Sequence, residues 1–156
     1  MQALSNFNFP LLSIPAYHLL SMYPHIHAMG VASQGDPKRM DNSNPHGSGM
    51  LDKIKQRLSA KDFSKYERAE SCHRNSLENE PLYIAAVLAG LLAEKSVNRS
   101  LGVDLFAGAF LGLRTLYTVL YINTESRNLS FVRSGVWALG VFSCFGMIGR
   151  AAMVLA

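Results

Sequence analysis

The sequence predicts an all-α integral membrane protein in which four helices cross the bilayer as a bundle. A spanning helix needs roughly 20 mainly apolar residues, and residues 101–122 and 131–154 both meet that requirement. Residues 9–33 contain no Asp, Glu, Lys or Arg, and residues 66–94 begin polar but end in an apolar run. The connections between the last three segments are short, so neighbouring helices should be antiparallel. We therefore expect one membrane domain over residues 1–156.

The first predicted span is apolar but is interrupted by prolines and histidines. These are Pro10, Pro15, Pro24, His18, His25 and His27. A proline fits the first turn of a helix, whereas Pro15 and Pro24 should kink its interior because proline has no backbone N–H to donate. His25 and His27 are two residues apart, so they face different sides of a helix. We therefore interpret the histidines as interfacial polar residues and expect no metal site.

The connection over residues 34–62 is rich in Gly, Pro, Asn and Ser, which is typical of a loop. Residues 51–63 show the apolar spacing of a short amphipathic helix. Basic residues gather in this connection and again at Arg127 and Arg133, so the positive-inside rule predicts that both connections are cytosolic. Because these basic residues are mixed with acidic ones, no nucleic-acid partner is expected.

A dense polar run, residues 67–79, precedes the apolar part of the second predicted span. Ionisable groups at membrane depth are costly and are therefore usually functional. The predicted topology places this run on the cytosolic side, where the third span ends and the fourth begins. The polar residues that converge there are Arg68, Arg74, Asn75, Glu78, Arg114, Tyr117, Tyr121, Arg133 and Ser134. A simpler alternative is a ladder of Glu70–Arg74 and Arg74–Glu78 ion pairs that only joins helices.

Such a cluster suits a small zwitterionic peptide with a net negative charge. Arginine side chains bind carboxylates through two parallel hydrogen bonds, and the Glu78 carboxylate can accept an ammonium group. A cationic pocket also favours a thiolate over a thiol. An anionic lipid head group would fit the same charges equally well, so the residues alone leave both ligands open.

The order and spacing of these residues resemble the MAPEG superfamily, the membrane-associated proteins in eicosanoid and glutathione metabolism. The matching motifs are Glu67-Arg68 followed by His73-Arg74-Asn75-x-x-Glu78, then Arg114-x-x-Tyr117-Thr118-Val119-x-Tyr121, Arg133-Ser134, and Asn44-Pro45 in the first connection. The resemblance covers roughly residues 9 to 154. The chain looks most similar to the fungal-type branch of the family.

The resemblance implies a trimer that binds glutathione between neighbouring subunits, near the cytosolic face of an intracellular membrane such as the endoplasmic reticulum. The residues that it assigns to glutathione binding are Arg68, His73, Arg74, Asn75, Glu78, Arg114 and Tyr121. Among these, Glu78 would take the amino group of glutathione. Arg68, Arg74 and Asn75 would hold its carboxylates and backbone.

The resemblance further implies that Arg133 and Ser134 lie near the glutathione sulfur and stabilise its thiolate. A lipophilic electrophile or lipid hydroperoxide would then enter from the bilayer, as in a transferase or peroxidase. Two departures from the prostaglandin E synthase branch argue against an isomerase role, because that branch has arginine at Ser71 and tyrosine at Trp137. Two other functions stay open, which are non-catalytic binding of a lipid or partner protein and a membrane scaffold.

Overall fold

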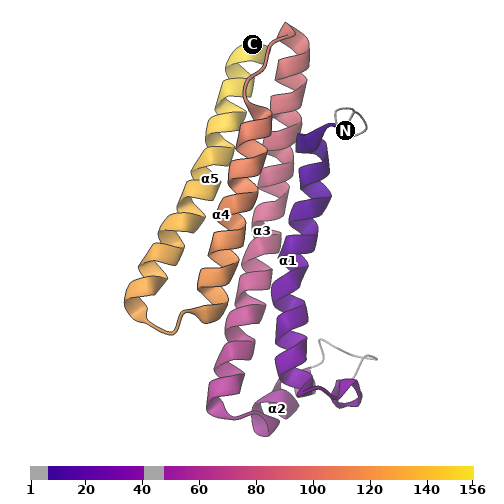
Figure 1. Cartoon of the computed structure of the whole chain (residues 1–156), viewed down its shortest axis with the longest axis vertical. Coiled ribbons are helices and arrows are strands. Elements are labelled where there is room, and N and C mark those ends of the chain that lie inside the picture. Colours follow the sequence, from indigo (N-terminus) through magenta and orange to yellow (C-terminus); the bar gives the residue numbers. More distant parts are fainter. Residues whose placement is uncertain (1–6, 41–47) are drawn as a thin grey trace, which may run out of the picture.

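A computed structural model describes residues 7–40 and 48–156, and in these residues the chain is helical without any strand. Its elements are α1 (Phe9–Ser33), the 3-10 turn η2 (Pro37–Arg39), α2 (Ser48–Arg57), α3 (Ala60–Val97), α4 (Val103–Asn123) and α5 (Arg127–Leu155). The all-α prediction is confirmed. The long helices α1, α3, α4 and α5 lie side by side, and α2 lies at the end where α1 stops and α3 begins (Figure 1).

The helix boundaries follow from polar caps. The Asn8 side chain accepts the N–H of Leu11 at 2.9 Å at the start of α1. At the same end of the molecule (Figure 1), Glu94 near the end of α3 uses Oε1 to accept the N–H groups of Leu101 and Val103, at 2.7 and 3.2 Å. Helix N-termini leave such N–H groups without intrahelical partners. Glu94 therefore fastens the start of α4 to the end of α3.

Helix α1 continues through both internal prolines, Pro15 and Pro24. The amphipathic helix predicted over residues 51–63 is shorter than expected, since α2 ends at Arg57 and α3 begins at Ala60. The break has a physical cause, because the Ser59 hydroxyl accepts the N–H of Asp62 at 3.1 Å and so caps a new helix. The motif residues Asn44 and Pro45 lie outside the described residues.

An aromatic cluster holds three of the long helices together. The rings of Tyr83 on α3 and Phe110 on α4 stack with centroids 4.1 Å apart. Tyr17 on α1 meets Tyr83 and Phe110 edge-on, at 5.3 and 5.1 Å. Aromatic pairs prefer such offset or edge-to-face arrangements, and burying them contributes strongly to packing. This cluster fixes the register of α1 and α4 against α3.

Farther along α3, Gly90 permits the closest approach between helices. A Cβ atom at this position would lie 2.8 Å from Val103 Cγ2 and 3.0 Å from Met147 Sδ. By contrast, the exposed Gly112 on α4 has no atom within 4 Å of the position a Cβ would take. Among the described glycines, Gly90 is therefore the one at which an added Cβ would clash with a neighbouring helix.

Among the described helices, α4 and α5 are long and apolar enough to cross a membrane, with mean hydropathies of 1.5 and 1.7. Their outward faces carry exposed apolar side chains such as Leu105, Phe142 and Met153. Helix α1 is diluted by His, Pro and Ser residues, and the first half of α3 is charged. Length and composition thus identify two of the predicted spans, and the bilayer crossing of α1 and α3 stays a prediction.

Candidate functional site

Arg114 of α4 lies inside the helix assembly. Only 2% of its surface is exposed, and its Nη2 donates to Ser76 Oγ at 3.1 Å. Its guanidinium carbon lies 4.4 Å from the ring centre of Tyr117 and 5.7 Å from that of Tyr17. No carboxylate pairs with it among the described residues. Two aromatic rings and one hydrogen bond therefore contact this buried cation, and its buried Nε has no hydrogen-bond partner among the described residues.

The residues around Arg114 join α1, α3 and α4. The Tyr17 hydroxyl donates to the Ser76 backbone oxygen at 2.8 Å, and the Ser76 hydroxyl donates to the Cys72 backbone oxygen at 2.9 Å. Cys72 Sγ lies 4.0 Å from Thr118 Oγ1. Each of these polar groups is satisfied within the chain, as buried polar groups usually are. These residues of the polar run therefore hold α1, α3 and α4 together.

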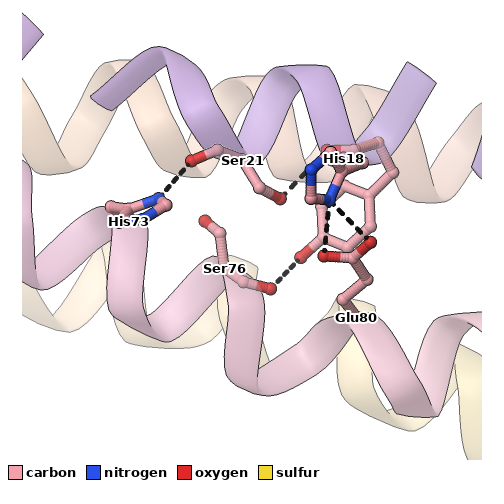
Figure 2. A network of polar contacts seen from close by, with 6 residues as sticks. His18, Ser21, His73, Ser76 and Glu80 are labelled. Atoms are coloured by element: carbon pink, nitrogen blue, oxygen red, sulfur yellow. Dashed lines mark hydrogen bonds and ion pairs between the residues drawn. The ribbon is translucent and has the colours of Figure 1, made fainter. Parts of the chain in front are cut away.

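Histidines and glutamates form a second set of contacts between α1 and α3 (Figure 2). His18 Nδ1 lies 3.0 Å from Glu80 Oε1, and His25 Nδ1 lies 2.8 Å from Glu70 Oε1. His73, predicted to bind glutathione, contacts the Ser21 backbone oxygen through Nδ1 at 2.7 Å. Among the described residues, no group of three or more His, Cys, Asp or Glu side chains is placed to hold a metal ion.

This α1–α3 contact was not foreseen from the sequence. The available signal was the spacing of His18 and His25, which are seven residues apart and therefore recur on one helix face. Their partners Glu70 and Glu80 lie on the antiparallel helix α3. Because Glu70 is taken by His25, it does not form the predicted pair with Arg74.

Arg68 lies at the end of the molecule where α1 and α4 finish. Its Nη1 donates to Ser64 Oγ at 2.9 Å, and its Nη2 donates to Glu125 Oε1 at 3.0 Å. Only 16% of the Arg68 side chain is exposed, against 60% for Glu125. Arg68 also lines a polar pocket of about 460 Å³ that includes neither Arg74 nor Glu78. The structure thus separates Arg68 from the other predicted glutathione residues of α3.

The outward face of α3 carries Ser71, Arg74 and Glu78, all exposed, with Asn75 partly buried at its edge. Within residues 7–40 and 48–156, neither Arg74 nor Glu78 forms a hydrogen bond or ion pair with another side chain. The predicted Arg74–Glu78 ion pair is therefore absent from that part of the chain. An exposed cation and an exposed anion, one helical turn apart, are available to a ligand that carries both charges.

Helix α5 contributes a cation beside an aromatic ring. The Arg133 guanidinium lies 3.9 Å from the ring centre of Tyr121, so the structure brings these two predicted residues together. Ser134 is exposed and its hydroxyl donates to the Ser130 backbone oxygen at 3.0 Å. Cys72 of α3 and Val136 of α5 belong to one apolar cluster, which places this part of α5 against α3. No hydrogen bond or ion pair joins Arg133 to Glu78 within the described residues.

The site residues thus form three groups with different chemistry. Arg114 and His73 are engaged in contacts within the chain, and Arg68 is paired with Glu125. Arg74 and Glu78 present opposite charges on an open surface of α3. Arg133 and Tyr121 form a cation–aromatic pair at the start of α5. Arg74 and Glu78 of the second group are exposed without a side-chain partner among the described residues, whereas Arg114 and Arg68 each have a buried Nε that lacks a hydrogen-bond partner there.

A comparison with known protein families identifies one match, to the MAPEG family, over residues 15–153. Comparisons with curated proteins and with solved structures give no match. The family match covers all four long helices in nearly their full length. It agrees with the polar motifs on α3, α4 and α5 and with the two apolar helices. The chain belongs to the MAPEG family, a family of membrane proteins concerned with glutathione.

Proposed function

We propose that this chain is a membrane-bound glutathione-dependent transferase or peroxidase that acts on lipophilic electrophiles or lipid hydroperoxides. The observation that carries the proposal is the pair Arg74 and Glu78, exposed and without side-chain partners among the described residues, in a chain of the MAPEG family. Glutathione has two carboxylates and one ammonium group. Its charges complement a surface that offers both signs.

In this proposal, the outward face of α3 binds the peptide. Arg74 takes a carboxylate through a charge-assisted hydrogen bond, and Asn75 contacts the peptide backbone. Glu78 takes the ammonium group. Ser71 occupies the position at which the prostaglandin E synthase branch has an arginine. Binding of the glutathione carboxylate therefore depends more strongly on Arg74.

Arg133 and Ser134 would act on sulfur. A nearby guanidinium favours the thiolate over the thiol, and the thiolate is the reactive nucleophile. The Ser134 hydroxyl would turn from the Ser130 backbone oxygen to donate its hydrogen bond to the same sulfur. In conjugation, the sulfur forms a bond to an electrophilic carbon and the leaving group departs with the bonding electron pair. Stacking on Tyr121 holds the Arg133 guanidinium in place before the ligand arrives.

The remaining predicted residues would hold the helices that carry this binding surface in place. Arg114 keeps α3 and α4 in register through Ser76. His73 fastens α3 to α1 through Ser21, and Arg68 holds the α4–α5 connection through Glu125. We assign them to positioning the binding residues rather than to direct contact with glutathione.

The proposal includes the assembly and the membrane setting. Helices α1 and α3 cross the bilayer with α4 and α5, the subunits form a trimer, and glutathione binds between neighbouring subunits on the cytosolic side of an intracellular membrane. Family membership supports the trimer, and the basic residues of the first connection support the orientation. An outward-facing polar surface on α3 suits a site that a neighbouring subunit completes.

The test uses the full chain purified in detergent. Titration calorimetry should detect glutathione binding, and a chlorodinitrobenzene-type acceptor or an organic hydroperoxide should be turned over in its presence. Glu78→Gln should bind glutathione much more weakly, whereas Lys95→Gln, at the opposite end of α3, should retain the wild-type affinity. Absence of glutathione binding by the wild type contradicts the whole proposal. Binding without turnover of any acceptor contradicts the enzymatic part and leaves a ligand-binding protein.

A further inference from the structure

A polar pocket lies where α1, α3 and α4 meet, away from the outward face of α3. Its volume of about 460 Å³ falls within the range of roughly 300–1,000 Å³ that is usual for ligand sites. Its walls include Gly30 of α1, Lys65 of α3 and Asn123 of α4. The proposed glutathione surface contributes no residue to it.

In the proposed membrane setting, the pocket lies at the depth of a membrane surface. Helix α4 is one of the two apolar helices long enough to cross a bilayer, and it ends at Asn123. Ile122 and Asn123 both line the pocket, as do Val31 and Gln34 at the end of α1. The wall therefore changes from apolar to polar where these helices end. A lipid head group, with its acyl chains in the bilayer, is located at this depth.

The charges in the pocket come in two signs. Lys65 Nζ lies 3.8 Å from Asp62 Oδ1, and Arg68 Nη2 lies 3.0 Å from Glu125 Oε1. The first distance is long for an ion pair, and 60% of the Glu125 side chain is exposed. The Lys65–Asp62 pair is exposed on both sides, and such pairs contribute little to stability. A ligand with its own phosphate and ammonium groups could therefore exchange partners with this pair at little cost, and reach Arg68 from the exposed Glu125 side of the second pair.

We infer that this pocket binds the head group of an aminophospholipid of the ethanolamine type. The phosphate accepts hydrogen bonds from Lys65 and Arg68, and the primary ammonium donates to Glu125 and Asp62. The apolar side chains of Val31 and Ile122 contact the start of the lipid tails. A choline head group carries the same phosphate, but its quaternary nitrogen has no N–H to donate, so it binds more weakly.

Gly30 provides a way to block the pocket without removing a charge. It lines the pocket, and a Cβ at this position would have no atom within 4 Å. A side chain can therefore begin at this position without a clash at its Cβ, so Gly30→Leu adds bulk at the pocket wall. Gly112 is a matched control, because it is also an exposed helical glycine with open space around it, and it lies outside the pocket.

The experiment follows thermal unfolding of the full chain in detergent with added dioleoylphosphatidylethanolamine, dioleoylphosphatidylcholine or soluble glycerophosphoethanolamine. The ethanolamine lipid should raise the unfolding midpoint by a few degrees more than the choline lipid, because a ligand of the folded state stabilises it. Gly30→Leu should abolish this difference, and Gly112→Leu should keep it. Lys65→Gln should reduce it, and Lys61→Gln, one turn away and outside the pocket, should not.

Equal shifts with both lipids overturn the inference, as does a full ethanolamine effect in Gly30→Leu. An equal shift with glycerophosphoethanolamine assigns the pocket to a soluble phosphoethanolamine and overturns the lipid source. Loss of glutathione affinity in Gly30→Leu would make the pocket part of the glutathione site and would also overturn the lipid assignment. Because lipid and glutathione are measured separately, failure of either proposal is recognised on its own.

Discussion

Within the same few turns of α3, the polar residues on its two faces make different contacts. The inward residues Cys72, Ser76 and Asn79 are buried and bonded within the chain. The outward residues Arg74 and Glu78 are exposed and bind no other side chain among the described residues. One continuous polar run in the sequence is therefore two sets of residues. The inward set holds helices together, and the outward set is available to a ligand.

The largest effect should come from the buried cation that the inward face supports. Arg114→Ala removes a side chain that fills the space between the Tyr17 and Tyr117 rings. Loss of buried volume on this scale should lower the free energy of unfolding by about 2–5 kcal/mol. Thermal unfolding in detergent measures this loss of stability. Arg114→Met keeps most of the volume and should recover most of the stability, and a wild-type midpoint for Arg114→Ala would contradict the inward assignment.

The next effect should come from close packing on the inward face. Gly90→Leu places a side chain where a Cβ alone would lie 2.8 Å from Val103 Cγ2. Overpacking of this kind should cost about 1–3 kcal/mol in unfolding free energy. Gly112→Leu, on an open surface, should change the midpoint little. Equal midpoints for the two variants would mean that α3 and α4 do not approach as closely as described.

A smaller effect should follow from removing one buried hydrogen bond. Tyr17→Phe deletes the hydroxyl that donates to the Ser76 backbone oxygen at 2.8 Å and keeps the ring in its aromatic cluster. A typical intramolecular hydrogen bond contributes about 1 kcal/mol. The control is Tyr23→Phe on the exposed side of the same helix, which should be neutral. An unchanged unfolding free energy in Tyr17→Phe would contradict the conclusion that the inward polar groups hold the helices together.

The sequence was sufficient to predict α4, α5 and the family, but not the full extent of α3. The apolar length of residues 101–122 and 131–154 predicts α4 and α5 closely, because few soluble helices are so apolar for so long. The extent of α3 was underestimated, since its polar first turns carry no apolar signal for a helix. Membership of a family was also readable from the spacing of the motif residues, and the family comparison confirms the membership.

The orientation of individual side chains was not predictable from the same patterns. An arginine in an apolar helix has the same local sequence whether it faces the interior, as Arg114 does, or a neighbouring subunit. Its direction depends on the Tyr17 and Ser76 side chains of two other helices. Likewise, the pairing of Glu70 with His25 instead of Arg74 depends on how α1 packs against α3. Such contacts between distant segments need the folded chain.

The smallest effect on stability should come from the outward face. Arg74→Gln and Glu78→Gln change exposed side chains that contact no other side chain in the described part of the chain. Surface substitutions of this kind usually change the unfolding free energy by less than about 0.5 kcal/mol. Their thermal midpoints in detergent should therefore match the wild type. A large loss of stability in either variant would show that the outward residues are structural after all.

The most direct test of the account is the affinity of purified protein for glutathione, measured by calorimetry for wild type, Glu78→Gln and Tyr17→Phe. A hydrogen bond to a charged group contributes about 1.5–3 kcal/mol, so Glu78→Gln should weaken binding roughly tenfold to a hundredfold at unchanged stability. Tyr17→Phe should show the reverse, with lower stability and nearly unchanged affinity. Wild-type affinity in Glu78→Gln, or no glutathione binding by the wild type, would contradict the assignment of the outward face as the binding surface.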